Sequence, residues 1–150
     1  MFTDWALASL HHLAVFALAA VLAAELAILT LDIDAKGLGR LVRIDMAYGV
    51  LAGIVVLVGV ARVIWGAKGY EYYVANHIFG TKMALFLIVG LLSIPPTLRY
   101  LAWGRRLRAD PAFRPEVSEI ARMRWYLRAE AAFFLAIPVA AAAMARGYGM

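Results

Sequence analysis

Five side chains at similar depth in the apolar segments of the sequence have the chemistry of a cofactor site. All three histidines, His11, His12 and His77, lie near the outer ends of apolar segments, and Arg62 and Lys82 lie at a comparable level. Imidazole nitrogens are axial ligands of haem iron, and a helical bundle supplies the apolar walls that the macrocycle needs. The sequence therefore predicts a haem b site in which His77 and one of His11 and His12 bind the iron.

The choice between His11 and His12 stays open at this point. Neighbouring positions on a helix point about 100° apart, so only one of the two can face a given partner. His11 shares a face with Glu25, the only carboxylate deep within that apolar segment, which favours His11 as the residue pointing inward. His12 shares a face with Phe16, which would suit a flat cofactor.

Lys82 and Arg62 are expected to face the propionates of a haem or the carboxylates of another anionic ligand. The alternative is that both cations extend to the membrane interface and bind nothing. A zinc or copper site is less favoured, because no carboxylate lies close in sequence to the histidines.

A second group of ionisable residues lies toward the other ends of the same segments. We expect these side chains to form ion pairs that tie helix ends together, and they are Glu25, Arg43, Asp45, Arg99, Arg128 and Glu130. The alternative is a proton path or quinone site centred on Glu25, since ionisable groups within a membrane span are often functional.

The elements that must position these residues are apolar helices. The chain has 150 residues, of which 65% are hydrophobic, and no cysteine; its mean hydropathy is +0.79. Four apolar stretches, at about 5–31, 41–65, 77–101 and 125–145, each approach or exceed the roughly 20 residues that cross a bilayer as a helix. The sequence predicts an all-α, integral membrane four-helix bundle in a single domain, 1–150. Pro95 and Pro96 should kink the third helix or begin its exit.

Charge predicts the orientation of this bundle. The third connection and its flanks carry eight arginines, namely Arg99, Arg105, Arg106, Arg108, Arg114, Arg122, Arg124 and Arg128. Basic loops face the cytoplasm, so both termini should lie on the non-cytoplasmic side of a bacterial inner membrane. We interpret the arginines as topology signals that contact anionic lipid, and we expect no nucleic-acid partner.

Small residues on the second helix predict close packing. Gly49 and Gly53 form a GxxxG pattern, which lets helix backbones approach each other. We favour packing inside the bundle over the alternative, a face for a homodimer.

Four short segments carry a resemblance to an uncharacterised bacterial family of small four-helix membrane proteins, a domain of unknown function. The segments are Leu10 to Leu13, Arg43 to Gly49, Lys82 to Phe86 and Gly90 to Thr97. A weaker similarity, carried by His11 or His12 and by Lys82, is to the four-helix membrane protoporphyrinogen oxidase, and it implies bound haem b.

The leading hypothesis is a small b-type cytochrome-like protein with haem near the outer leaflet. It would pass electrons between a quinone or membrane redox partner and an acceptor. One alternative is a non-catalytic accessory subunit or assembly factor of a larger membrane complex. A further alternative is a tetrapyrrole-oxidising enzyme, so the sequence leaves enzymatic activity open.

Overall fold

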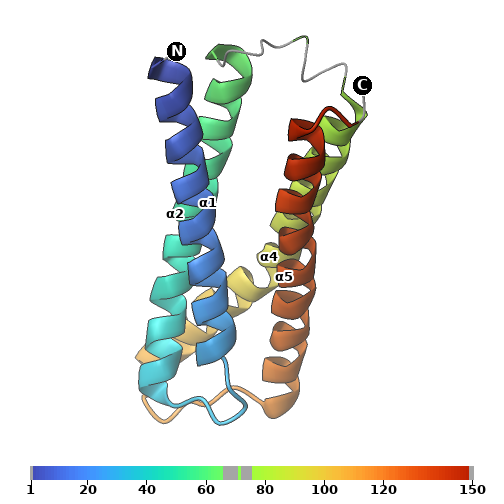
Figure 1. The fold of residues 1–150 in the computed structure, drawn as a ribbon. Coiled ribbons are helices and arrows are strands. Elements are labelled where there is room, and N and C mark those ends of the chain that lie inside the picture. The colour runs from blue at the N-terminus through green and yellow to red at the C-terminus, as the bar shows by residue number, and fades with distance from the viewer. Residues whose placement is uncertain (1, 66–70, 72–75, 149–150) are drawn as a thin grey trace.

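The predicted all-α bundle is confirmed by a computed structural model, which describes residues 2–65, 71 and 76–148 (Figure 1). Its four helices are α1 (Phe2–Ile28), α2 (Ala35–Trp65), α4 (His77–Ala109) and α5 (Val117–Ala145), and the described residues contain no strand. Both termini lie at one end of the bundle, and the α1–α2 and α4–α5 connections lie at the other, here called the loop end.

The helices begin and end at residues that hydropathy did not predict. α2 begins at Ala35 rather than near residue 41. At this start of the helix, the Asp34 carboxylate accepts a hydrogen bond from the Gly37 amide at 2.7 Å. α4 continues to Ala109 and α5 begins at Val117, so the arginine-rich connection is mostly helical. Hydropathy reports the part of a helix that suits lipid, whereas local capping and backbone hydrogen bonds determine where the helix ends.

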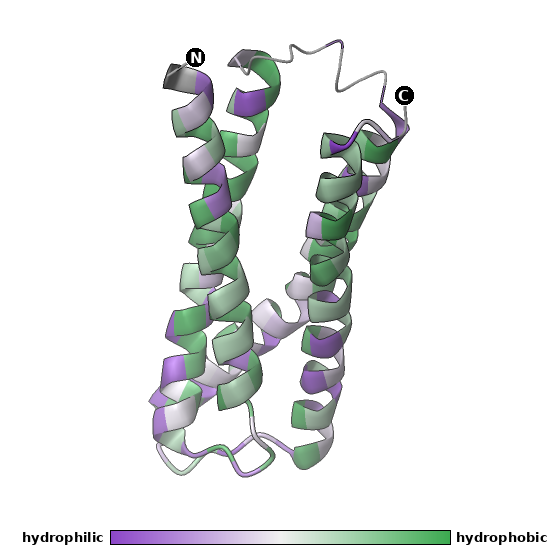
Figure 2. Cartoon of the chain, viewed as in Figure 1, coloured by the Kyte–Doolittle hydropathy of each residue, from purple (hydrophilic) through white to green (hydrophobic). Residues whose placement is uncertain are grey.

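The outer faces of the bundle are apolar, as lipid requires. All four helices are long and apolar enough to cross a membrane. Phe16, Leu57 and Val139 are each at least 70% exposed, while Glu25 and Glu130 are buried. Figure 2 shows hydrophobic residues along most of each helix and hydrophilic ones gathered toward the loop end. This is a multi-pass membrane protein with a few acidic side chains buried inside the bundle.

The bundle consists of two helix pairs, α1 with α2 and α4 with α5, which separate toward the termini and come together at the loop end (Figure 1). α4 carries Pro95 and Pro96 within the helix and bends in its middle, in agreement with the predicted kink. Beyond the bend it packs against α2. Gly104 permits this contact, because a Cβ atom there would lie only 3.2 Å from the Val42 side chain.

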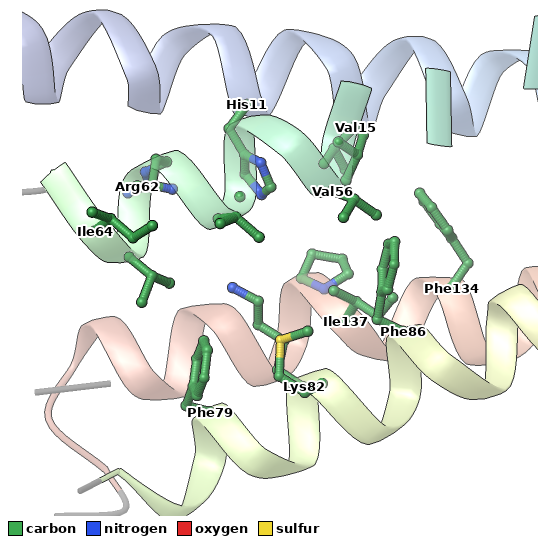
Figure 3. Close-up of a pocket in the computed structure, with 16 residues that line it drawn as sticks. His11, Val15, Val56, Arg62, Ile64, Phe79, Lys82, Phe86, Phe134 and Ile137 are labelled. Carbon is green, nitrogen blue, oxygen red and sulfur yellow. The ribbon is translucent and has the colours of Figure 1, made fainter. Parts of the chain in front are cut away.

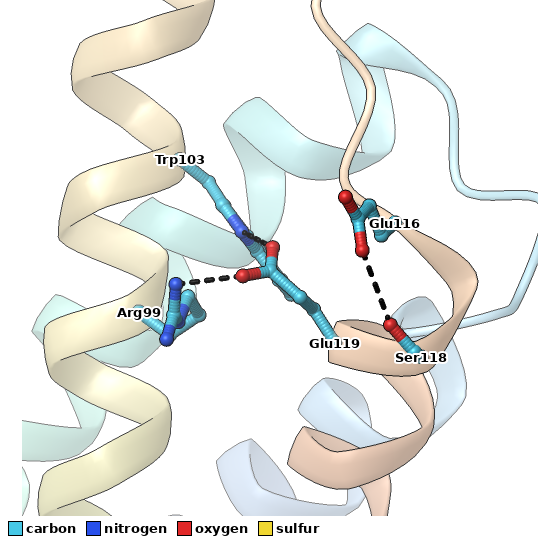
Figure 4. Close-up of polar contacts among 5 residues, drawn as sticks. All are labelled: Arg99, Trp103, Glu116, Ser118 and Glu119. Atoms are coloured by element: carbon cyan, nitrogen blue, oxygen red, sulfur yellow. Dashed lines mark hydrogen bonds and ion pairs between the residues drawn. The ribbon is translucent and has the colours of Figure 1, made fainter.

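One carboxylate holds the last part of α4 against the start of α5 (Figure 4). Glu119 accepts hydrogen bonds from the Arg99 guanidinium at 2.7 Å and from the Trp103 indole nitrogen at 3.1 Å. Trp103 is almost fully buried. This contact, which we call the Glu119 clamp, was not predicted.

The predicted network of ion pairs among the inner ionisable residues is wrong for the part of the chain that the structure describes. Arg99 pairs with Glu119 instead of with a carboxylate of that group. Arg43 and Arg128 are exposed. The reason is that a long cationic side chain near a helix end gains more from water and headgroups than from a buried partner.

The prediction that Gly49 and Gly53 pack inside the bundle is also wrong. Both glycines are exposed, and no heavy atom lies within 4 Å of the position that a Cβ atom would take. They occupy the outer face of α2, so a homodimer face remains a prediction.

Candidate functional site

A cavity of about 420 Å³ lies where the two helix pairs separate (Figure 3). It falls within the roughly 300–1,000 Å³ of small-molecule sites. All four helices contribute to it, and its walls are mainly valine, isoleucine, methionine and phenylalanine side chains. The cavity exists because α4 packs against α5 before the bend and reaches α2 only beyond the bend.

Three nitrogen-bearing side chains face this apolar space from three helices. They are His11 on α1, Arg62 on α2 and Lys82 on α4. Figure 3 shows the His11 ring and the Lys82 amine directed into the space between the helix pairs. Each of the three lies within electrostatic range of the others. No acidic side chain is among the residues that line the cavity.

His11 is a half-buried imidazole with a free nitrogen. The Val55 backbone lies near the ring, but Nδ1 has no hydrogen-bond partner among the described residues. Gly59 on α2 faces the ring, and a Cβ atom there would lie 3.5 Å from its Cε1 atom. A larger residue at position 59 would therefore extend along the imidazole into the cavity.

Arg62 likewise has a buried donor, its Nε atom, without a partner in the part of the chain that the structure describes. A buried polar atom without a hydrogen bond costs roughly 1–3 kcal/mol. Unpaired nitrogens on two neighbouring side chains of one cavity suggest that these side chains bind a ligand.

Aromatic rings form much of the remaining wall. Phe79 and Phe86 come from α4, and Phe134 with Ile137 and Pro138 comes from α5. Such walls suit a flat ring system. These residues were not predicted from the sequence, because in a uniformly apolar helix the residue type does not indicate whether a position faces lipid or the interior.

The other two predicted iron ligands lie outside the cavity. His12 is exposed, with Nδ1 2.7 Å from the Ala8 carbonyl oxygen of its own helix. His77 is exposed at the first residue of α4, after the N-cap Asn76. The structure therefore does not bring His77 together with His11 or His12 at the cavity, and of the two adjacent histidines only His11 is among the described residues that line it.

A metal centre built from side chains alone is also not assembled. Within residues 2–65, 71 and 76–148, no three histidine, aspartate or glutamate side chains are grouped so that they could hold a metal ion. The arrangement provides one imidazole, two cations and apolar walls, which suits an amphiphilic anionic ligand.

Comparison with known proteins identifies the family of the chain. No curated protein and no solved structure matches it. A family model described as a predicted membrane protein, DUF2214, matches residues 3–149. This range includes all of α2, α4 and α5, all but the first residue of α1, and every described residue that lines the cavity. The chain therefore belongs to the DUF2214 family of predicted membrane proteins.

Proposed function

We propose that this protein binds a haem or a closely related tetrapyrrole in the cavity, where His11 would hold the iron. Arg62 and Lys82 would bind the propionates. The single observation that supports the proposal most strongly is the convergence of these three side chains on one cavity with aromatic walls. The revised site has one histidine ligand rather than two.

The residues present fit such a group in three respects. The Nδ1 atom of His11 is buried and has no hydrogen-bond partner among residues 2–65, 71 and 76–148, which leaves it available to an iron ion. No acidic side chain is among the described residues of the cavity wall, which leaves the cations for a ligand's carboxylates. Phe79 and Phe86 provide apolar ring contacts.

A haem bound here would supply one-electron redox chemistry. His11 would fix its orientation and influence its reduction potential, while Arg62 and Lys82 would neutralise its carboxylates. With the termini on the non-cytoplasmic side of a bacterial inner membrane, the cavity would lie in the outer leaflet. A quinone or another membrane redox protein would be the partner.

The test is the absorption spectrum of the protein purified after haem-replete expression. We expect a Soret band that His11→Ala abolishes, while His12→Ala and His77→Ala retain it. The adjacent His12 is a matched control, because it shares the helix and the residue type but points out of the cavity. A folded, colourless wild type would refute the proposal. If a stoichiometric partner copurifies with that colourless protein, the result would favour the alternative that this chain is an accessory subunit of a larger membrane complex.

The cations provide a second, graded test. A hydrogen bond to a charged group contributes roughly 1.5–3 kcal/mol, and 1.4 kcal/mol is tenfold in affinity. Lys82→Gln should therefore weaken haem binding about 10- to 100-fold in a titration, whereas Arg146→Gln, which removes an exposed charge after α5, should not. Equal affinities of both variants would exclude Lys82 from ligand binding.

A second candidate function is oxidation of protoporphyrinogen with a quinone as acceptor. The specific observation in its favour is that His11 and Lys82, on which the resemblance to the four-helix oxidase rests, line the same cavity. Protoporphyrin formation by the purified protein, lost in Lys82→Ala, would support it. Haem binding without this activity would leave the electron-transfer role.

A further inference from the structure

A second polar site lies deep in the bundle, among residues that do not line the cavity. Each of the four helices contributes to it: Glu25 from α1, Asp45 and Tyr48 from α2, Tyr100 from α4 and Glu130 from α5. None of these five side chains is more than 6% exposed. We call these residues the interior acidic cluster.

The hydrogen bonds within the cluster are incomplete. Tyr48 donates its hydroxyl to Oε1 of Glu130, and the Thr97 hydroxyl donates to Oδ1 of Asp45 at 2.7 Å. Oε1 of Glu25 and the hydroxyl oxygen of Tyr100 have no partner among the described residues. Both unpaired atoms are within electrostatic range of the other carboxyl groups of the cluster.

The groups that act electrostatically on Glu25 are themselves acidic. Asp45 and Glu130 influence it directly, and Glu25 in turn acts on the hydroxyls of Tyr48 and Tyr100. Among the described residues, no lysine, arginine or histidine acts electrostatically on Glu25, Tyr48 or Tyr100.

The arginines nearest in sequence to the cluster do not pair with its carboxylates. Arg99 pairs with Glu119, and Arg43 and Arg128 are exposed. An unpaired carboxylate inside a membrane bundle is costly, and carboxylates that act on one another electrostatically, as Asp45 and Glu130 act on Glu25, also repel. Their charge therefore needs a compensating cation. The described acidic side chains are not grouped as metal ligands, which leaves protons.

We propose that the interior acidic cluster is a membrane-embedded proton-binding site in which Glu25 holds an exchangeable proton. Glu130 and Asp45 are held in place by the Tyr48 and Thr97 hydroxyls, whereas Glu25 has an oxygen without a partner. Glu25 lies three residues before the end of α1, about 4.5 Å along the axis at 1.5 Å per residue. Protons would therefore exchange with the loop end. The site does not depend on haem binding.

The experiment is infrared spectroscopy of the wild-type protein in lipid vesicles at neutral pH. Protein labelled with ¹³C-glutamate identifies the carbonyl stretch of protonated glutamic acid without any substitution. We expect such a band, a shift of it in deuterium oxide, and its loss or reduction in Glu25→Gln. Glu119→Gln is the matched control, since Glu119 is a carboxylate of the same bundle that is paired with arginine.

Three outcomes would overturn the proposal. The first is a wild-type spectrum at neutral pH with no band from protonated glutamic acid. The second is a band that persists unchanged in a folded Glu25→Gln variant. The third is disappearance of the band at constant pH when sodium replaces choline, because the cluster would then hold a metal cation. None of these outcomes bears on the Soret band, so this proposal and the haem proposal fail separately.

Discussion

Removal of the Glu119 carboxylate should destabilise the bundle at the junction of α4 and α5. In Glu119→Ala the indole N–H of Trp103, which is 1% exposed, loses its acceptor. An unsatisfied buried donor costs roughly 1–3 kcal/mol. The Arg99 ion pair adds only about 0–1 kcal/mol, because the Arg99 side chain is 37% exposed and solvent screens it. The expected loss is therefore roughly 1–4 kcal/mol.

The assay is reversible unfolding of the purified protein by sodium dodecyl sulfate in mixed micelles, followed by circular dichroism. Glu116→Ala is the matched control, because Glu116 is an exposed carboxylate near the start of the same helix that only accepts a bond from Ser118 at 3.3 Å. Its free energy of unfolding should stay within about 0.5 kcal/mol of wild type.

A thermodynamic cycle separates the two halves of the Glu119 clamp. Arg99→Ala should cost about 1 kcal/mol or less. In a Trp103→Phe background there is no indole N–H that could lose its acceptor. Glu119→Ala should therefore lower the free energy of unfolding distinctly less than it does in the wild type. If Arg99→Ala were as costly as Glu119→Ala, or if the Phe background left the cost unchanged, the buried indole would not be the source of the stability.

Two further substitutions test the cavity and the interior. Gly59→Leu should preserve the fold, since its Cβ atom meets only ordinary contacts, but should weaken haem binding at least tenfold in a spectroscopic titration; Gly53→Leu, on the outer face of the same helix, should not. Tyr48→Phe leaves Glu130 without its donor and should lower the free energy of unfolding by about 0.5–2 kcal/mol, judged from hydrogen bonds in membrane bundles. Tyr126→Phe, half-buried against the Trp125 ring, should cost less in the same assay.

The number of helices could be predicted from sequence because each apolar stretch is long enough to settle the matter alone. Helix ends could not, since they depend on local contacts such as the Asp34 cap. The kink at Pro95 and Pro96 was predictable from the missing backbone donors, but its consequence was not. The bend directs one helix toward two different neighbours and thereby opens the cavity.

The candidate site was predicted in part, and the reason for the difference is geometric. His11, Arg62 and Lys82 share a depth, and depth follows from sequence position along each helix. His77 does not line the cavity, because the first residue of α4 is exposed. The direction in which this residue points depends on how the helices pack. His11 could have been chosen over His12, because it shares a face with Glu25, and Glu25 is buried.

The interior carboxylates show where reasoning from complementary charge fails. Arginines and carboxylates alternate along the inner ends of these helices, so pairing them seemed the natural prediction. Yet an arginine gains contacts with headgroups and water by extending outward. A short carboxyl side chain that faces the interior of the bundle cannot reach the surface. Among the described residues, the interior acidic cluster toward the loop end therefore has no paired cation, and the basic side chains of the cavity have no acidic side chain beside them in the cavity wall. An anionic ligand at one end and bound protons at the other would each supply the charge that the chain itself leaves out.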